Sequence, residues 1–230
     1  MKIILVCGPE QTGSTLLFNL LNFILKKDHV TDSCWFEDYL NGSYNKECDY
    51  LILKIHEYDE YMEKISDYKF LTLRDFRDSA ISRLRRLGIK SPVYKKNKKY
   101  NLKFIGDYIE HNIDLFNIWF PSCNYVFKYE DYFDKKRKII KIIGTILNID
   151  LTKDDLTRII KNSRELYNSK TIPENDDREN ELYKKTLMSK KHNTSNGKTK
   201  KYLEFFTPEM CDKIINLNDK IKTFYNKYYI

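Results

Sequence analysis

Apolar and polar positions alternate along the chain in a pattern that predicts short strands and amphipathic helices in turn. Four short apolar runs are rich in β-branched and aromatic residues, as strands are: 2–7, 50–55, 69–73 and 124–128. Apolar residues recur with helical spacing over four other segments: 14–27, 76–87, 103–119 and 132–147. Strands that alternate with helices predict an α/β fold, in which three α/β/α layers are built around a central, mostly parallel sheet.

Two later segments carry signals for the start of a helix. Thr152 precedes Asp155 with the spacing of a capping box, and Thr207 precedes a proline, which suits the first helical turn. Residues 88–101 and 164–201 are polar instead, and we predict that they are irregular. In an α/β fold, long loops at the carboxyl edge of the sheet commonly form the rim of a ligand site.

The length of 230 residues predicts a single domain, residues 1–230, with a substantial core. Hydrophobic residues make up 41% and charged residues 32%, as in an ordinary globular protein. No apolar run approaches the roughly 20 residues that span a bilayer, and the apolar stretch before Gly8 is too short for a secretory signal. We therefore expect a cytoplasmic protein without a transmembrane segment.

The formal net charge of +8 favours an anionic ligand, such as a nucleotide, a nucleic acid or an acidic glycan. A general bias towards lysine explains the same excess, so charge alone decides nothing. The five cysteines are scattered without a CxxC pair, which argues against a zinc site and against a disulfide framework. We expect reduced cysteines and no bound metal.

The segment 8–15, Gly-Pro-Glu-Gln-Thr-Gly-Ser-Thr, joins the first predicted strand to the first predicted helix. A glycine-containing loop in that place turns backbone N–H groups towards a phosphate at the helix N-terminus. The two glycines have the spacing of a nucleotide-binding P-loop, but Ser14 stands where such loops carry a lysine. The loop therefore suits a less charged phosphate better than the β- and γ-phosphates of ATP.

Lys54 and His56 lie at the end of a predicted strand and on the same side of an extended chain. A neutral histidine can accept a proton from a hydroxyl group, and a lysine can stabilise charge that develops on a leaving oxygen. The same pattern also fits two exposed polar side chains without a chemical role.

Arg74 follows the strand 69–73 directly, where a guanidinium can hold a phosphate by two hydrogen bonds, and Ser82 lies two helical turns further on. Asp75 and Asp78 have the spacing of helix-capping residues, and we predict that role for both. We expect the arginines that follow to form a solvated helix face: Arg83, Arg85 and Arg86.

Tyr129 follows the strand 124–128, where it can pack on a purine or serve the fold alone. Near the C-terminus, Ser195, Gly197 and Lys198 can wrap an anion or belong to an ordinary polar loop. Position alone does not choose between these alternatives.

Taken in order, these pieces resemble the motifs of the PAPS-dependent sulfotransferase family, where PAPS is 3′-phosphoadenosine-5′-phosphosulfate. The similar segments are a phosphosulfate loop at 10–15, a Lys-x-His pair at 54–56, an Arg-(x)7-Ser motif at 74–82, a Tyr-Glu-Asp at 129–131 and a closing segment that ends Gly-Lys-x-x-x-Tyr-x-x-Phe-Phe-Thr at 192–207. The resemblance runs from about residue 2 to about residue 210. Each motif alone is weak, but five in order at the expected junctions are specific.

The resemblance implies that His56 is the general base for an acceptor hydroxyl or amine, and that Lys54 stabilises the bridging oxygen as the sulfuryl group leaves. It implies PAPS as donor, adenosine 3′,5′-bisphosphate (PAP) as product, and no metal, because in-line transfer needs positioning and charge stabilisation. The residues implied at the 5′-phosphosulfate are Gln11, Thr12, Gly13, Ser14 and Thr15. Those implied at the 3′-phosphate are Arg74, Ser82, Ser195, Gly197 and Lys198, with Tyr129 near the adenine.

The chain departs from the family pattern in three places. Gln11 replaces the usual lysine or arginine of the loop, so one cation that would neutralise the transferring group is missing. Leu16 replaces a tryptophan that often follows the loop, and Ser195 and Asn196 stand where Arg-Lys is common. Because of Gln11, a family member that binds the nucleotide without turnover remains an alternative.

Two other classes of function remain possible at the level of sequence. A P-loop kinase of nucleotides or small molecules would need ATP and Mg²⁺, and Ser14 argues against it. A basic nucleic-acid-binding protein has the lysine blocks in its favour but no stacking motif, so we expect no nucleic-acid partner. The expected partner is a small-molecule, glycan or lipid acceptor that carries a hydroxyl group.

Overall fold

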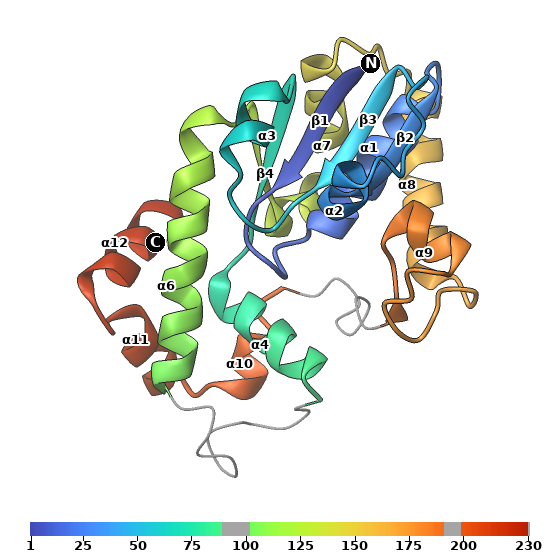
Figure 1. The fold of residues 1–230 in the computed structure, drawn as a ribbon. Helices are drawn as coiled ribbons and strands as arrows, with labels where there is room; N and C mark the ends of the chain where they lie inside the picture. The colour runs from blue at the N-terminus through green and yellow to red at the C-terminus, as the bar shows by residue number, and fades with distance from the viewer. Residues whose placement is uncertain (89–101, 191–198, 230) are drawn as a thin grey trace.

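The computed structural model of the protein describes residues 1–88, 102–190 and 199–229, and its centre is a five-stranded sheet. The strands are β1 (Lys2–Cys7), β2 (Thr31–Trp35), β3 (Tyr50–Lys54), β4 (Tyr68–Leu73) and β5 (Tyr125–Lys128). All neighbouring strands are parallel, and their order across the sheet is β2-β3-β1-β4-β5. The predicted α/β fold with a parallel sheet is therefore confirmed (Figure 1).

β2 is the strand of this sheet that the hydrophobic pattern missed. Its sequence, Thr-Asp-Ser-Cys-Trp, buries only Cys34. β2 lies at the edge of the sheet, where it pairs with β3 alone, so it needs no continuous apolar run.

Alternating side chains of β1 divide the hydrophobic core between the two faces of the sheet. Ile3 and Leu5 belong to one buried cluster, whereas Ile4 and Val6 belong to the other. Three helices cover the face of Ile4 and Val6: α1 (Ser14–Leu25), α7 (Tyr129–Ile146) and α8 (Lys153–Asn168). The opposite face is covered by α3 (Glu60–Ile65), α4 (Phe76–Arg86), α6 (Leu102–Trp119), α10 (Tyr202–Phe205), α11 (Pro208–Ile215) and α12 (Asp219–Tyr228).

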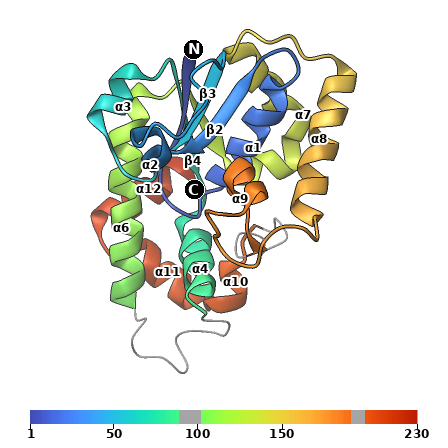
Figure 2. The ribbon, with the colours of Figure 1, turned by 45° about the vertical axis from the view of Figure 1, so that its right-hand side comes forward.

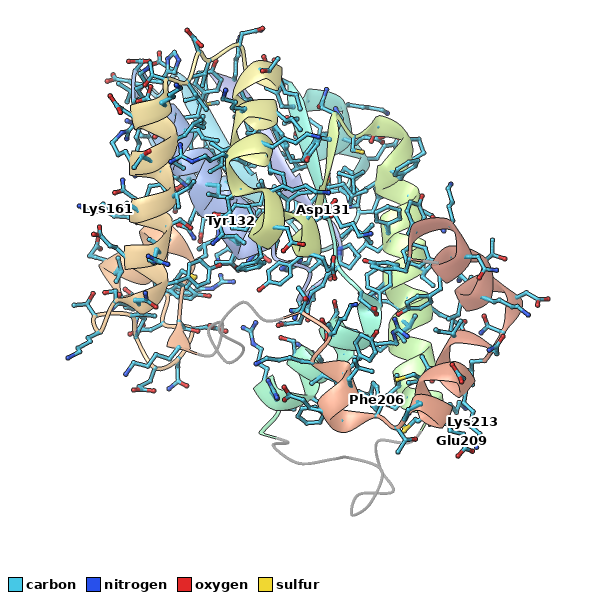
Figure 3. The ribbon with its side chains drawn as sticks, turned by 180° about the vertical axis from the view of Figure 1, so that it is seen from behind. Asp131, Tyr132, Lys161, Phe206, Glu209 and Lys213 are labelled. Atoms are coloured by element: carbon cyan, nitrogen blue, oxygen red, sulfur yellow. The ribbon has the colours of Figure 1, made fainter. Side chains whose placement is uncertain are left out.

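The two layers of helices can be followed in Figures 1 and 2, where α6 stands on one side of the sheet and α7 and α8 on the other. Figure 3 shows α7 and α8 from behind. Tyr132 of α7 lies inside, where it is 3% exposed, while Lys161 of α8 points outwards. Because helices cover both faces, β1, β3 and β4 read as nearly continuous apolar runs in the sequence.

Both predicted helix starts are confirmed. Thr152 and Asp155 form a reciprocal capping box at the start of α8, and the Thr207 side chain accepts a hydrogen bond from the backbone of Met210 in α11. The prediction that 164–201 is irregular is wrong in part, because α8 continues to Asn168 and α9 (Glu181–Thr186) follows. α9 is short and polar, and it is held by a single buried tyrosine in its middle.

Within the parts of the chain that the structure describes, no helix combines the length and apolar character needed to cross a membrane. Two small elements complete the fold, α2 (Phe36–Leu40) and the 3₁₀ turn η1 (Phe120–Ser122).

The order of the strands decides where a ligand site can form. From β1 the chain moves to one side of the sheet for β2 and β3 and then to the other side for β4 and β5. Connections that leave in opposite directions open a crevice at the carboxyl ends of the strands, and this crevice is the general ligand position in α/β sheets.

Candidate active site

Gly13 ends the loop after β1 and sets the start of α1. Its φ is +97°, and a Cβ atom there would overlap the ring of Tyr129, so both the backbone and the available space require glycine. No side chain caps α1, and no acidic residue lies in its first turn. The N-terminus of this helix therefore presents uncapped N–H groups and a favourable dipole to an anion.

The side chain of Thr12 turns into the core. Its Oγ1 lies 2.5 Å from the carbonyl oxygen of Pro9 and 2.6 Å from Oγ1 of Thr72. The loop residues that line the adjoining cavity are Glu10, Gln11, Gly13, Ser14 and Thr15. Of the five loop residues implied by the sequence, Thr12 can therefore contribute main-chain atoms only.

Lys54 reaches the same cavity from the end of β3. Its Nζ donates a hydrogen bond of 2.7 Å to Oγ1 of Thr15 and lies 4.3 Å from the centre of the Trp35 ring. Burial, followed by the nearby charge of Arg86, lowers the pKa of Lys54 to about 7. An anion in the cavity would favour the protonated form, so the charge of this lysine depends on what is bound.

His56 lines the cavity just beyond the end of β3. Its Nδ1 lies 3.0 Å from the carbonyl oxygen of Gly8. Because a carbonyl oxygen only accepts hydrogen bonds, we assign the proton of the neutral ring to Nδ1. Nε2 then carries the lone pair and is the nitrogen that can take a proton from a substrate.

Arg74 follows β4 and is 4% exposed. Its guanidinium lies 4.4 Å from the centre of the Tyr129 ring, and one of its nitrogens is 3.7 Å from the carboxylate of Asp78. Nη1 donates a hydrogen bond of 3.4 Å to the carbonyl oxygen of Gln11, whereas Nε has no hydrogen-bond partner among the described residues. A buried guanidinium with an unused donor in a cavity wall suits a phosphate.

Gln11 and Ser82 meet across the cavity. The hydroxyl of Ser82 donates a hydrogen bond of 3.0 Å to Oε1 of Gln11. Gln11 has a left-handed backbone, with φ of +62°, which is uncommon for a residue with a side chain. The position that carries a cation in the family is therefore neutral here, and its side chain is directed at α4.

The expectation of a solvated arginine face on α4 is wrong, since even the side chain of Arg85 is only 18% exposed and packs on the Phe205 ring. Arg83 and Arg86 line the cavity. Arg83 pairs with Glu10 at 2.9 Å, and Arg86 pairs with Asp176. Only Arg85 points elsewhere, towards α10. The carboxylates come from segments far away in sequence, which is why helical spacing alone could not place these arginines.

Asp75 and Asp78 play different parts, although both were expected to cap α4. Asp75 does cap the helix, since its Oδ1 accepts a hydrogen bond of 3.0 Å from the backbone N–H of Arg77. Asp78 instead accepts hydrogen bonds of 2.7 and 2.9 Å from the backbone N–H groups of Lys200 and Tyr202. The capping role predicted for Asp78 is therefore wrong, because a segment more than a hundred residues away uses its carboxylate.

Tyr129 also lines the cavity, but it lies beside the loop and beneath Arg74. Its ring therefore lies between Gly13 of the loop and the guanidinium of Arg74. The remaining candidates, Ser195, Gly197 and Lys198, lie outside the described residues.

Two aromatic residues of the cavity were missed by the sequence argument, Trp35 and Tyr167. Trp35 is paired in register with Lys54, so the strand that was not predicted delivers the aromatic neighbour of that lysine. The signal was present as an aromatic residue at the end of a polar, edge-type strand. Tyr167 comes from the last turn of α8, in the segment predicted to be irregular.

Comparison with known proteins decides the family. The sulfotransferase domain model matches residues 2–224. The chain belongs to the sulfotransferase family. No curated protein matches it by sequence.

Solved sulfotransferase structures share the fold over the whole chain. Mouse sulfotransferase SULT7A1 complexed with PAP superposes with a TM-score of 0.71 at 13% identity, covering 98% of this chain and 88% of the mouse chain. Retinol dehydratase with androsterone and the inactive cofactor PAP gives a TM-score of 0.68 at 15% identity, covering 100% and 83%. The same enzyme with retinol and PAP gives 0.66 at 15% identity, with the same coverage. At these identities the likeness establishes the fold.

Proposed function

We propose that this sulfotransferase moves the sulfuryl group of PAPS to a hydroxyl group of an acceptor, with His56 as general base. The observation that carries the proposal is the gathering of His56, Lys54, the loop at the start of α1 and Arg74 around one cavity. Uncapped helical amides suit the 5′-phosphosulfate, and a buried guanidinium suits a second phosphate. PAPS carries such groups at its two ends.

The chemical step follows from the placement of the two side chains after β3. Nε2 of His56 takes the proton of the acceptor hydroxyl while its oxygen attacks sulfur. The bond between sulfur and the bridging oxygen breaks, and its electron pair stays on the 5′-phosphate of PAP. Lys54 is charged when an anion is bound and stabilises that oxygen.

A thermal-shift experiment tests the donor site. PAP should raise the melting temperature of the protein, whereas AMP and ATP with Mg²⁺ should leave it nearly unchanged, since only PAP engages both phosphate sites. Sulfuryl transfer from PAPS should persist in EDTA. A shift with ATP and Mg²⁺ but none with PAP would favour the kinase instead.

A protein that binds PAP without turnover is the second candidate, and the neutral Gln11 is the observation that favours it. Binding of PAP with no transfer to any acceptor would support this alternative. Measurable transfer that is lost in His56→Ala would exclude it.

A further inference from the structure

A second cavity opens from the catalytic histidine. It shares Glu10, His56 and Arg83 with the cavity described above and continues towards α6. Its space amounts to about 220 Å³, which is below the usual range for drug-sized ligands. A molecule held here would therefore be small and would present an atom to His56.

The walls of this second cavity are polar. Besides the three shared residues, it is lined by Glu57, Tyr108, His111, Asn112 and Leu115. Leucine is the one aliphatic residue among them, so a steroid or another apolar acceptor would leave polar groups without partners. The cavity has two carboxylates, of Glu10 and Glu57, and one guanidinium, of Arg83. The guanidinium is already paired with Glu10.

Asn112 points to a ligand that forms hydrogen bonds. The residue is 2% exposed, and its Nδ2 has no hydrogen-bond partner among the described residues. It lies beside the phenol of Tyr108, whose pKa is raised by burial and whose hydroxyl donates to the carbonyl oxygen of Glu10 at 3.3 Å. The Tyr108 hydroxyl lies within reach of this amide, and a ligand oxygen that approaches the pair would complete its hydrogen bonding.

We propose that the second cavity binds a small acceptor rich in hydroxyl groups and free of negative charge, of the size of one sugar unit. One hydroxyl would lie at His56, and the others would bond to Glu57, His111 and Asn112. The inference rests on the proposed function, since it names the acceptor of the same reaction.

The test compares four acceptors in sulfuryl transfer from PAPS: methyl glucoside, its 2-amino analogue, its uronic acid analogue and 2-naphthol. The two sugars without negative charge should be sulfated most efficiently. Preference for 2-naphthol or for the uronic acid, or transfer to none of the four, would overturn the inference. The PAP thermal shift remains an independent test of the donor site.

Glu57→Gln should raise KM for the amino sugar about 2- to 5-fold, the effect of losing a partly exposed charge partner, and change kcat little. Asn112→Leu keeps the side-chain volume and should raise KM for both sugars without altering the PAP shift. Glu165→Gln, on the outer part of α8, is the matched control and should change nothing. Equal KM values in all three variants would show that the sugar binds elsewhere.

The loop before α1 has the neutral Gln11 where the family carries a cation. Arg86 lines the donor cavity from the last turn of α4, and its charge helps to lower the pKa of Lys54. Its partner Asp176 is in turn hydrogen-bonded by Ser189 at 2.6 Å, so two distant segments orient the guanidinium. Lys54 and Arg86 are thus two basic side chains that line the same cavity as His56.

We infer that Arg86 neutralises the transferring group in place of the loop cation absent at Gln11. Arg86→Ala should lower kcat about 10-fold or more, because charge on the departing sulfuryl group is stabilised less. PAP, which lacks that group, should bind nearly as before. Arg85→Ala, one position away and directed at α10, is the control.

The decisive variant is Gln11→Lys combined with Arg86→Ala. If Arg86 acts through charge, the new lysine should restore part of the lost kcat. No loss in Arg86→Ala, an equal loss of PAP affinity, or no recovery in the double variant would each overturn the assignment. Melting temperatures of all variants distinguish a loss of function from a loss of folding.

Discussion

In the proposed reaction, His56 acts on the acceptor and Arg74 binds the donor. His56 is positioned by the carbonyl of Gly8, which leaves Nε2 as its basic nitrogen. Arg74 is held by the Tyr129 ring and Asp78, and its Nε has no hydrogen-bond partner in the described parts of the chain. Two residues with such different surroundings should fail in different ways when they are replaced.

His56→Ala should abolish sulfuryl transfer while PAP affinity stays nearly unchanged, because a general base acts on the acceptor. Arg74→Ala should weaken PAP by about 2–4 kcal/mol, the scale for removing one partner of a buried charge pair. Calorimetric titration with PAP and a transfer assay measure the two effects. An equal loss of PAP affinity in both variants would contradict this division of roles.

The pKa of Lys54 predicts a pH effect on binding. Its folded value of about 7 lies below the usual lysine value, so above that pH the side chain is neutral in the empty protein. Arg86 opposes its charge, whereas Glu10 and Asp176 favour it. An anionic donor requires the charged form, so binding at about pH 8.5 should take up roughly one proton.

Calorimetry of PAPS binding in buffers with different ionisation enthalpies measures this uptake. Lys54→Arg, which stays charged, should show no such contribution from this position. Identical binding enthalpies in all buffers for the original protein would mean that Lys54 is already charged when the cavity is empty.

Among single residues, the sequence predicted the positions of those that come at or directly after the end of a strand. The carboxyl ends of parallel strands lie at one edge of the sheet. This predicted that Lys54, His56 and Arg74 lie close together. Arg86 was misplaced because its partner Asp176 lies ninety residues away, and no local pattern encodes that pairing.

Elements differ in how much their own sequence determines them. α8 carries its start signal within four residues, since Thr152 and Asp155 exchange hydrogen bonds. β2 has almost no signal of this kind in its own sequence, because it forms by pairing with β3. This is why the start of α8 was predicted from sequence and β2 was not.

Thr152→Ala should lower the free energy of unfolding by about 1 kcal/mol, the usual effect of losing an N-cap side chain. Thr157→Ala, in the interior of the same helix, is the matched control and should change stability little, since alanine favours helix. Urea denaturation compares the two. Equal effects would mean that the cap contributes nothing specific.

On the scale of the whole molecule, α4 is joined to a segment more than a hundred residues further along the chain. Asp78 of α4 holds the backbone of Lys200 and Tyr202 and lies beside Arg74. Burial raises the pKa of Asp78, and the charge of Arg74 opposes that rise. The carboxylate therefore couples the C-terminal segment to Arg74, the arginine that we propose binds a phosphate.

Asp78→Asn should weaken PAP binding and lower the melting temperature together, because the amide can replace only part of the hydrogen bonding and leaves Arg74 without its charge partner. Asp59→Asn, which keeps an effective N-cap on α3 and does not line the cavity, is the control. Unchanged PAP affinity in Asp78→Asn would separate the C-terminal segment from donor binding. Such a contact between distant segments follows from the packed fold, and no motif in the sequence announces it.

The intrinsic fluorescence of Trp35 can report on ligand binding. The chain has two tryptophans: Trp119, the last residue of α6, is fully buried, while Trp35 lies in the cavity wall against the ammonium group of Lys54. When PAPS draws that ammonium group towards itself, the electric field at the Trp35 indole changes and its emission should shift, whereas Trp119 should stay constant as an internal reference. Fluorescence could therefore follow occupancy of the pocket without any label, and Trp35→Phe should silence the signal.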